Sequence, residues 1–170
     1  MPEWIARVPR RATPLSGVRE GATCALLPRF FPGPARIPWF RMGYTKKNLV
    51  ADVENQAPSF GMPDELDARF ARPALGGKTL GLSLMRLAPG FRVPFGHKHE
   101  NQEEVYVVLR GSARVKVDDE IVELGELDAI RFDKGTMRAV EAGSDGVEYV
   151  AFGAGDDPRD AELVQGWWSD

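Results

Sequence analysis

The sequence predicts an all-β domain, a sandwich or a small barrel. Beyond Lys78, apolar residues recur at every second position, which is typical of strands with one buried face. Glycine-rich turns separate these short stretches at a spacing of about ten residues. The chain has 170 residues, of which 43% are hydrophobic and 28% are charged, with a formal net charge of -3. These values are typical of an ordinary globular protein.

The first 41 residues differ in composition from the rest of the chain. Residues 1–41 contain seven Arg, two Glu and seven of the 13 prolines. Closely spaced prolines exclude a helix or an inner strand, so we expect a disordered head. A transit-like peptide and an arm for an acidic partner are alternatives. A further hypothesis starts the native protein at Met42, because charge, proline use and periodicity all change there. Residues 42–170 are then a single domain, with its motifs within residues 79–153.

The elements of this domain follow from local patterns. Proline and acidic residues in its first turn favour a short helix that begins near Gly61, and Pro73 is expected to end it. The pair Asp118-Asp119 predicts a tight hairpin between two strands. The expected strands span residues 79–87, 105–109, 113–117, 121–122, 129–132, 137–141 and 147–152.

The two histidines of the chain are the sharpest chemical signal. His97 and His99 are separated by one residue, Lys98. In a strand, both imidazoles project from the same face while Lys98 points away. Imidazole is a good ligand for Zn, Fe, Ni, Cu or Mn, and a carboxylate helps to neutralise a divalent ion. If residues 100–103 form a turn, a carboxylate at the start of the returning strand faces both histidines. The spacing therefore predicts a metal site; a solvated loop with ordinary surface charges is the alternative.

The segment from Gly90 to Gly111 resembles the first motif of the cupin superfamily. That motif reads Gly, five residues, His-x-His, three or four residues, Glu, six residues, Gly. The resemblance implies that His97 and His99 are metal ligands. Gly111 sets the register that makes Glu104 the carboxylate ligand. Gly90 precedes the first histidine by six residues instead of five, a departure that a loop or a β-bulge would absorb.

The second cupin motif is matched by its frame only. Alignment on Gly135 places Leu127 at the first glycine of the motif and Arg138 at its histidine. Arginine stays protonated and has no lone pair, so the fourth ligand of the family is missing.

The arginine at this position leaves three interpretations open. In the first, His97, His99 and Glu104 still hold a metal with open positions, and Arg138 binds a substrate carboxylate or phosphate. In the second, the metal is lost and Arg138 pairs with Glu104 in a pocket for an organic ligand. In the third, a register error leaves Arg138 on the outer face, paired with Glu141 or with solvent.

The resemblance implies a double-stranded β-helix, the cupin jelly-roll barrel, that binds one divalent metal ion (Fe, Mn, Zn or Ni). We favour an enzyme of the dioxygenase or isomerase type that acts on a small anionic molecule by metal-assisted chemistry. The alternative is a metal-free cupin that binds or senses a small molecule through Arg138. Tyr106 shares strand parity with Glu104 and joins Arg138 as an expected substrate-binding residue. No catalytic residue is assigned.

Composition also limits the partners. Residues 42–170 carry 15 basic and 23 acidic residues, which argues against nucleic acid. The longest apolar run has five residues, too few to span a membrane. The single cysteine, Cys24, cannot form an intrachain disulfide, so we expect a cytoplasmic protein.

Two apolar features suggest contacts beyond the core. Val105, Val107 and Leu109 would form an outward strand face, which is compatible with a homodimer. The paired Trp167 and Trp168 would dock on the domain itself, with a subunit interface as the alternative.

Overall fold

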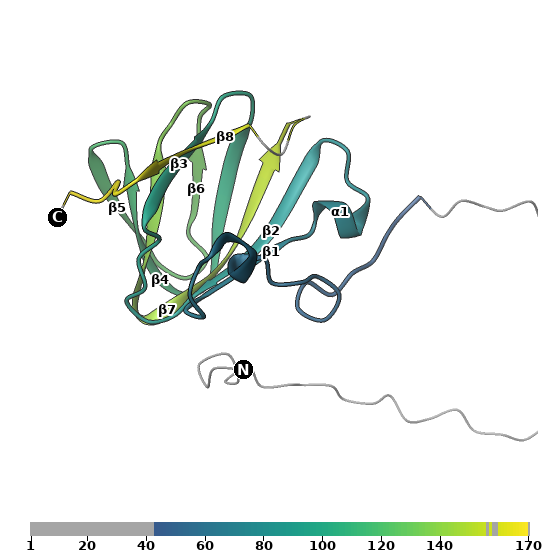
Figure 1. Cartoon of the computed structure of the whole chain (residues 1–170), viewed down its shortest axis with the longest axis horizontal. Coiled ribbons are helices and arrows are strands. Elements are labelled where there is room, and N and C mark those ends of the chain that lie inside the picture. The colour runs from purple at the N-terminus through teal and green to yellow at the C-terminus, as the bar shows by residue number, and fades with distance from the viewer. Residues whose placement is uncertain (1–42, 156, 158–159, 170) are drawn as a thin grey trace, which may run out of the picture. The chain divides into compact units, whose positions relative to one another are not determined.

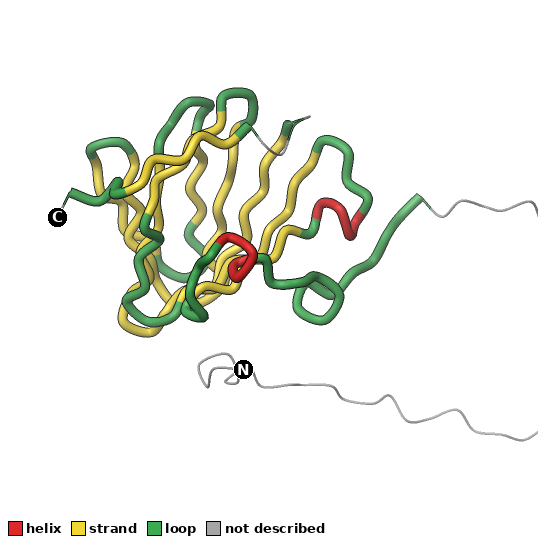
Figure 2. The backbone as a smooth tube through the Cα atoms, viewed as in Figure 1, coloured by secondary structure: helices red, strands yellow, loops and turns green. Residues whose placement is uncertain are grey.

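The structure is a computed structural model that describes residues 43–155, 157 and 160–169. The predicted disordered head, residues 1–41, lies outside the described residues. Strands far outweigh helices in the described part, which confirms the predicted all-β class (Figures 1 and 2). The strands are β1 (Leu66–Phe70), β2 (Leu80–Leu87), β3 (Phe95–His99), β4 (Glu103–Val117), β5 (Glu120–Leu124), β6 (Ala129–Phe132), β7 (Arg138–Ala154) and β8 (Ala161–Gln165). No helix in the described ranges is long and apolar enough to cross a membrane.

The strands of the described part form one eight-stranded sheet with the order β1-β2-β7-β3-β8. The long strand β4 pairs antiparallel with β7 and also with β5 and β6. The sheet curls, so β3 lies opposite β4 although the two strands are not hydrogen-bonded neighbours. The inner face carries the apolar core, to which β4 contributes Tyr106, Val108, Ala113 and Val115. Each pair agrees with the period of two in the sequence, and the parity changes between Val108 and Ala113, where the register with β7 shifts.

The bend of the two long strands depends on a close approach of Gly111 in β4 to Gly146 in β7. Gly111 has φ 75°, and a Cβ atom there would overlap the carbonyl oxygen of Gly146. The pairing register of β4 and β7 shifts on either side of this point. Only a residue without a side chain fits here, which explains the final glycine of the first motif.

The short helix predicted over residues 61–70 is wrong. Residues 66–70 form β1, whose Leu66 lies opposite Leu87 of β2. Antiparallel pairing with a distant strand overrides the local helix signal. Pro73 does not end a helix but lies in the first turn of α1 (Arg72–Leu75), where its missing N–H costs no hydrogen bond.

The two strands predicted over residues 137–141 and 147–152 are joined. They are the two halves of β7, continuous from Arg138 to Ala154. The glycines between them bend the strand without ending it. The hairpin at Asp118-Asp119 is confirmed, because β4 ends at Val117 and β5 begins at Glu120.

Candidate metal centre

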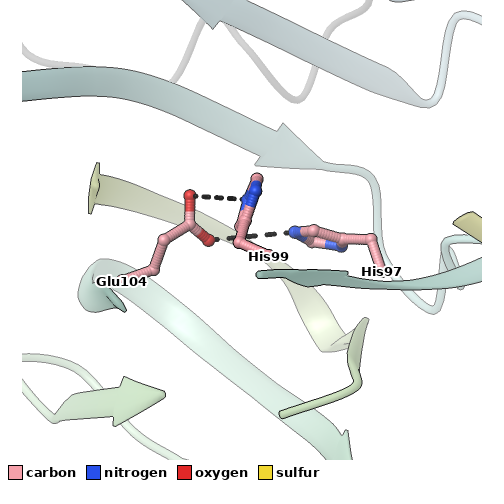
Figure 3. A group of neighbouring side chains, drawn as sticks. All are labelled: His97, His99 and Glu104. Carbon is pink, nitrogen blue, oxygen red and sulfur yellow. Dashed lines mark ion pairs between the residues drawn. The ribbon is translucent and has the colours of Figure 1, made fainter. Parts of the chain in front are cut away.

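Two strands bring the three predicted metal ligands together. His97 and His99 project from β3, and Glu104 projects from the start of β4 (Figure 3). The Nε2 atom of His97 lies 3.8 Å from Oε2 of Glu104, and Nε2 of His99 lies 3.4 Å from Oε1. One nitrogen or oxygen from each residue lies within 4.8 Å of the others. The intervening Lys98 points away from the site, as predicted, and its amine pairs with Glu162 at 3.0 Å.

The second ring nitrogen of His99 is held by residues that the sequence did not indicate. Nδ1 of His99 lies 2.6 Å from Oδ1 of Asp160, directly before β8. The amide nitrogen of Gln102 lies 2.8 Å from the same Nδ1 and 3.1 Å from Oδ1 of Asp160. A carboxylate can only accept, so the shorter contact, 2.6 Å to Asp160, assigns the proton to Nδ1. The amide of Gln102 is also a donor, so it donates to Asp160 and not to Nδ1.

This arrangement turns the Nε2 lone pair of His99 toward Glu104. When Nδ1 of a neutral imidazole holds the proton, Nε2 is an acceptor. The neighbouring Oε1 of Glu104, at 3.4 Å, is also an acceptor. Two acceptors in contact need a positive charge between them, which is either a second imidazole proton or a metal ion. Metal-ligating histidines commonly donate their other N–H to a carboxylate in this way.

His97 is poised to act as a neutral ligand. Burial lowers the pKa of its imidazole, although the nearby carboxylate of Glu104 opposes this effect. Arg138 and His99 lower the pKa further through their charges. The hydroxyl group of Tyr106 lies 3.3 Å from Nε2 of His97. A neutral imidazole offers the lone pair that a metal requires.

Arg138 lies inside the curled sheet, as the frame of the second motif predicts. Only 1% of its surface is exposed, and its Nη2 donates to Oε2 of Glu104 at 2.5 Å. This excludes the interpretation that Arg138 lies on the outer face with Glu141. Glu141 instead pairs with Arg92 and Arg114, each at 2.9 Å.

The remaining donors of the Arg138 guanidinium are partly used. Its Nη1 donates to the carbonyl of Thr136 at 3.1 Å. Its Nε is buried and has no hydrogen-bond partner among the described residues. The guanidinium also lies over the ring of Phe132, 5.3 Å from its centroid.

The carboxyl group of Glu104 is ionised at neutral pH. Burial by itself would raise its pKa, but contacts with the nitrogens of His97 and His99 and the charge of Arg138 outweigh burial. The net result is a pKa far below the usual range of a glutamate. The group is therefore a permanent carboxylate, which metal binding requires.

The donor set fits a divalent transition metal. Two imidazole nitrogens and one carboxylate oxygen are ligands shared by Zn, Fe, Mn and Ni sites. Two donors about 2.1 Å from one ion lie at most about 4.2 Å apart. The ligand atoms of His97, His99 and Glu104 lie within 4.8 Å of one another, so small side-chain shifts would bring all three to bonding distance of one ion.

The motif residues and the curled sheet agree with the comparison of the chain with known families. A family model described as a cupin domain matches residues 83–152. Over these residues the chain is similar to cupin domains. The cupin match contains the three candidate ligands and Arg138, but it ends before Asp160 and β8.

Solved cupin structures resemble the chain in fold. A cupin protein from Bacteroides fragilis has 23% identity and a TM-score of 0.55, over 68% of this chain and 87% of that chain. A variant of oxalate decarboxylase from Bacillus subtilis has 26% identity and a TM-score of 0.56, over 71% and 33%. A sugar phosphate isomerase of the cupin superfamily from Silicibacter pomeroyi has 18% identity and a TM-score of 0.51, over 60% and 77%. The predicted double-stranded β-helix is confirmed. No curated protein sequence matches this chain.

Proposed function

We propose that this cupin binds one divalent metal ion through His97, His99 and Glu104 and that the resulting site takes a small anionic molecule. The observation that carries the proposal is the convergence of two imidazole nitrogens and a carboxylate within 4.8 Å. Asp160 directs the Nε2 lone pair of His99 into the same space. Such a set of acceptors is stabilised by a cation at its centre.

The charge balance favours an anionic ligand. Glu104 and Asp160 together offset the two positive charges of a divalent ion. The buried guanidinium of Arg138 then leaves the site with one net positive charge. We infer that this charge attracts a carboxylate or a phosphate, and that the unpartnered Nε of Arg138 adds a donor. Oxalate decarboxylase, a structural relative at 26% identity, is named for a small dicarboxylate.

The residues around the ligands have distinct proposed roles. Arg138 holds Glu104 in place, because its guanidinium is almost fully buried and donates to that carboxylate. Tyr106 offers its hydroxyl beside His97, where an incoming ligand can accept a hydrogen bond. When bound, the metal supplies Lewis-acid chemistry or a place for dioxygen. An enzyme of the dioxygenase or isomerase type is consistent with these roles.

A metal-free binding protein is the second candidate. The contact of 2.5 Å between Arg138 and Glu104 favours the metal-free protein, because it already gives one carboxylate oxygen a positively charged hydrogen-bond donor. In that case Arg138 is the centre of a pocket for a small acid. The two candidates differ in their response to a chelator.

The first experiment is elemental analysis of the full chain, purified without added metal and without a histidine tag. We expect about one divalent ion per chain, and its loss in Glu104→Gln. Glu103→Gln is the matched control, because Glu103 precedes Glu104 but pairs at the surface with Arg131. This control is expected to retain the ion.

The alternative makes the opposite prediction. A chain that holds no stoichiometric ion, even after incubation with Zn²⁺, Mn²⁺ or Fe²⁺, would overturn the metal proposal. Binding of small carboxylates that is unaffected by chelator but abolished in Arg138→Ala would then support the metal-free candidate.

A further inference from the structure

We propose that Asp160 is a positioning residue for His99 and that the C-terminal segment 160–168 sets the metal affinity of the site. This inference rests on the proposed metal-binding function. The family match ends at residue 152, so these residues lie outside the part of the chain that the cupin model describes.

The strand that carries both histidines depends on the C-terminal strand for its pairing. β3 pairs with β7 at one position, His97 opposite Arg138. It pairs with β8 at five positions, from Phe95 opposite Gln165 to His99 opposite Ala161. Without β8, one edge of β3 would lose its ladder, and strand edges without partners are mobile and exposed.

The segment is anchored beyond β8 by the two tryptophans. The indole nitrogen of Trp168 donates to the carbonyl of Val93 at 2.8 Å. The amine of Lys116 donates to the carbonyl of Trp167 at 2.8 Å. The ring of Trp167 lies so close to Gly96 that a Cβ atom there would overlap it. These contacts confirm that the paired tryptophans dock on their own domain, and they fix the register of β8 on β3.

At the opposite end of the segment, Asp160 holds His99 through an oriented carboxylate. The side chain of Asp160 is 8% exposed. Its Oδ2 accepts the backbone N–H of Asn101 at 2.9 Å, and its Oδ1 accepts the amide of Gln102 and Nδ1–H of His99. Both carboxylate oxygens of Asp160 therefore accept hydrogen bonds, and these bonds hold the carboxylate in its orientation toward His99. A carboxylate in this position fixes the tautomer of a metal-ligating histidine and raises the basicity of its other nitrogen.

The test compares Asp160→Asn and Asp160→Ala with the matched control Glu162→Gln in the full chain. Glu162 also lies beside β3, but its carboxylate pairs with Lys98 and does not touch a histidine. Titration calorimetry with Zn²⁺ is expected to show affinity about 10-fold to 100-fold weaker in both Asp160 variants. The control is expected to match the wild type. The melting temperature of each metal-free chain shows whether folding is preserved.

A second readout does not need a metal. The chain has two histidines, so ¹⁵N-labelled imidazoles give two sets of signals. At a pH where both rings are neutral, His99 is expected to carry its proton on Nδ1 in the wild type. In Asp160→Ala it is expected to shift toward the Nε2–H form.

The outcomes separate this inference from the proposed function. If the wild type binds Zn²⁺ and both Asp160 variants bind it equally well, the positioning role is overturned. If His99 shows the same tautomer in all chains, the role is overturned as well. If the wild type binds no Zn²⁺ but the tautomer shifts in Asp160→Ala, the metal function fails while the positioning of His99 by Asp160 stands.

Discussion

Leu127 has a backbone conformation that leucine rarely adopts. Its φ is 68°, and 76% of its surface is exposed. The left-handed conformation costs an ordinary residue about 1–2 kcal/mol, whereas glycine adopts it freely but loses about 0.5–1 kcal/mol of backbone entropy on folding. We expect Leu127→Gly to raise the free energy of unfolding by about 0.5–1 kcal/mol in urea denaturation.

The control for this substitution is Leu80→Gly. Leu80 is also exposed but lies in β2 with an ordinary strand conformation. Its replacement is expected to destabilise the chain, because glycine weakens a strand. Equal losses of stability in both variants would show that Leu127 is not strained. The frame of the second motif places a glycine at position 127, so the backbone keeps the conformation that the family pattern requires.

Arg138 and Glu104 form a buried ion pair, and its contribution to the free energy of unfolding should depend on whether a metal is bound. Arg138→Leu leaves the carboxylate without its partner, which we expect to cost about 3 kcal/mol in the metal-free chain. With excess Zn²⁺ the loss of stability should be smaller, because the bound ion replaces the positive partner that Arg138 provided to Glu104. Urea denaturation with and without Zn²⁺ measures both values.

The control for this pair is Arg131→Leu. Arg131 pairs with Glu103 on the surface, so its replacement should have little effect in either condition. An equal loss for Arg138→Leu with and without Zn²⁺ would contradict the metal site and favour the metal-free candidate.

The sequence was sufficient for the residues on two strands that follow one another in the chain. Strand parity predicts that His97 and His99 share one face. The spacing of the first cupin motif, with Gly111 at its end, adds Glu104 as the carboxylate that joins them. Asp160 could not be found in this way. It reaches His99 only because β8 returns to pair with β3, and no local pattern indicates that pairing. The contact is a property of the topology.

The elements show the same division between local and distant causes. Period-two alternation predicted β2 and β6 closely, because each strand has one buried face. The stretch that forms β1 was predicted as a helix, since the partner that holds it extended, β2, lies further along the chain. The glycine-containing bend within β7 was predicted as a break for a related reason. Pairing with β4 continues beyond the bend, and only the folded sheet reveals that continuity.

The bend itself yields a prediction at this scale. Gly111→Ala would force a Cβ atom onto the carbonyl of Gly146 in addition to straining φ. We expect a loss of about 3 kcal/mol or more in the free energy of unfolding. Gly61→Ala is the matched control. Gly61 has φ 70° but no atom within 4 Å of the added Cβ, so only the strain of about 1 kcal/mol remains. Similar losses in both variants would show that the close approach of β4 and β7 is not required.

For the whole molecule, the fold class and the resemblance to cupins were predictable because the first cupin motif lies in one continuous segment. The strand pairings that curl the sheet, such as that of β8 with β3, could not be predicted. Glu104 and Arg138 are 34 residues apart in the chain, yet their side chains meet. This contact also decides against the outer-face interpretation, which the sequence alone left open.

The outer face of the sheet bears on the state of the whole molecule in solution. Val105 and Val107 of β4 lie opposite Phe152 and Val150 of β7, and all four point away from the core that holds Tyr106. Phe152 is 37% exposed. An apolar face of this kind is stabilised by burial against a second copy, so we expect a homodimer. Sedimentation velocity of the full chain should give the mass of two chains. Val107→Glu should give the mass of one, since a charge would be buried at the interface. A wild-type chain that remains monomeric at high concentration would contradict the dimer and leave this face to another partner.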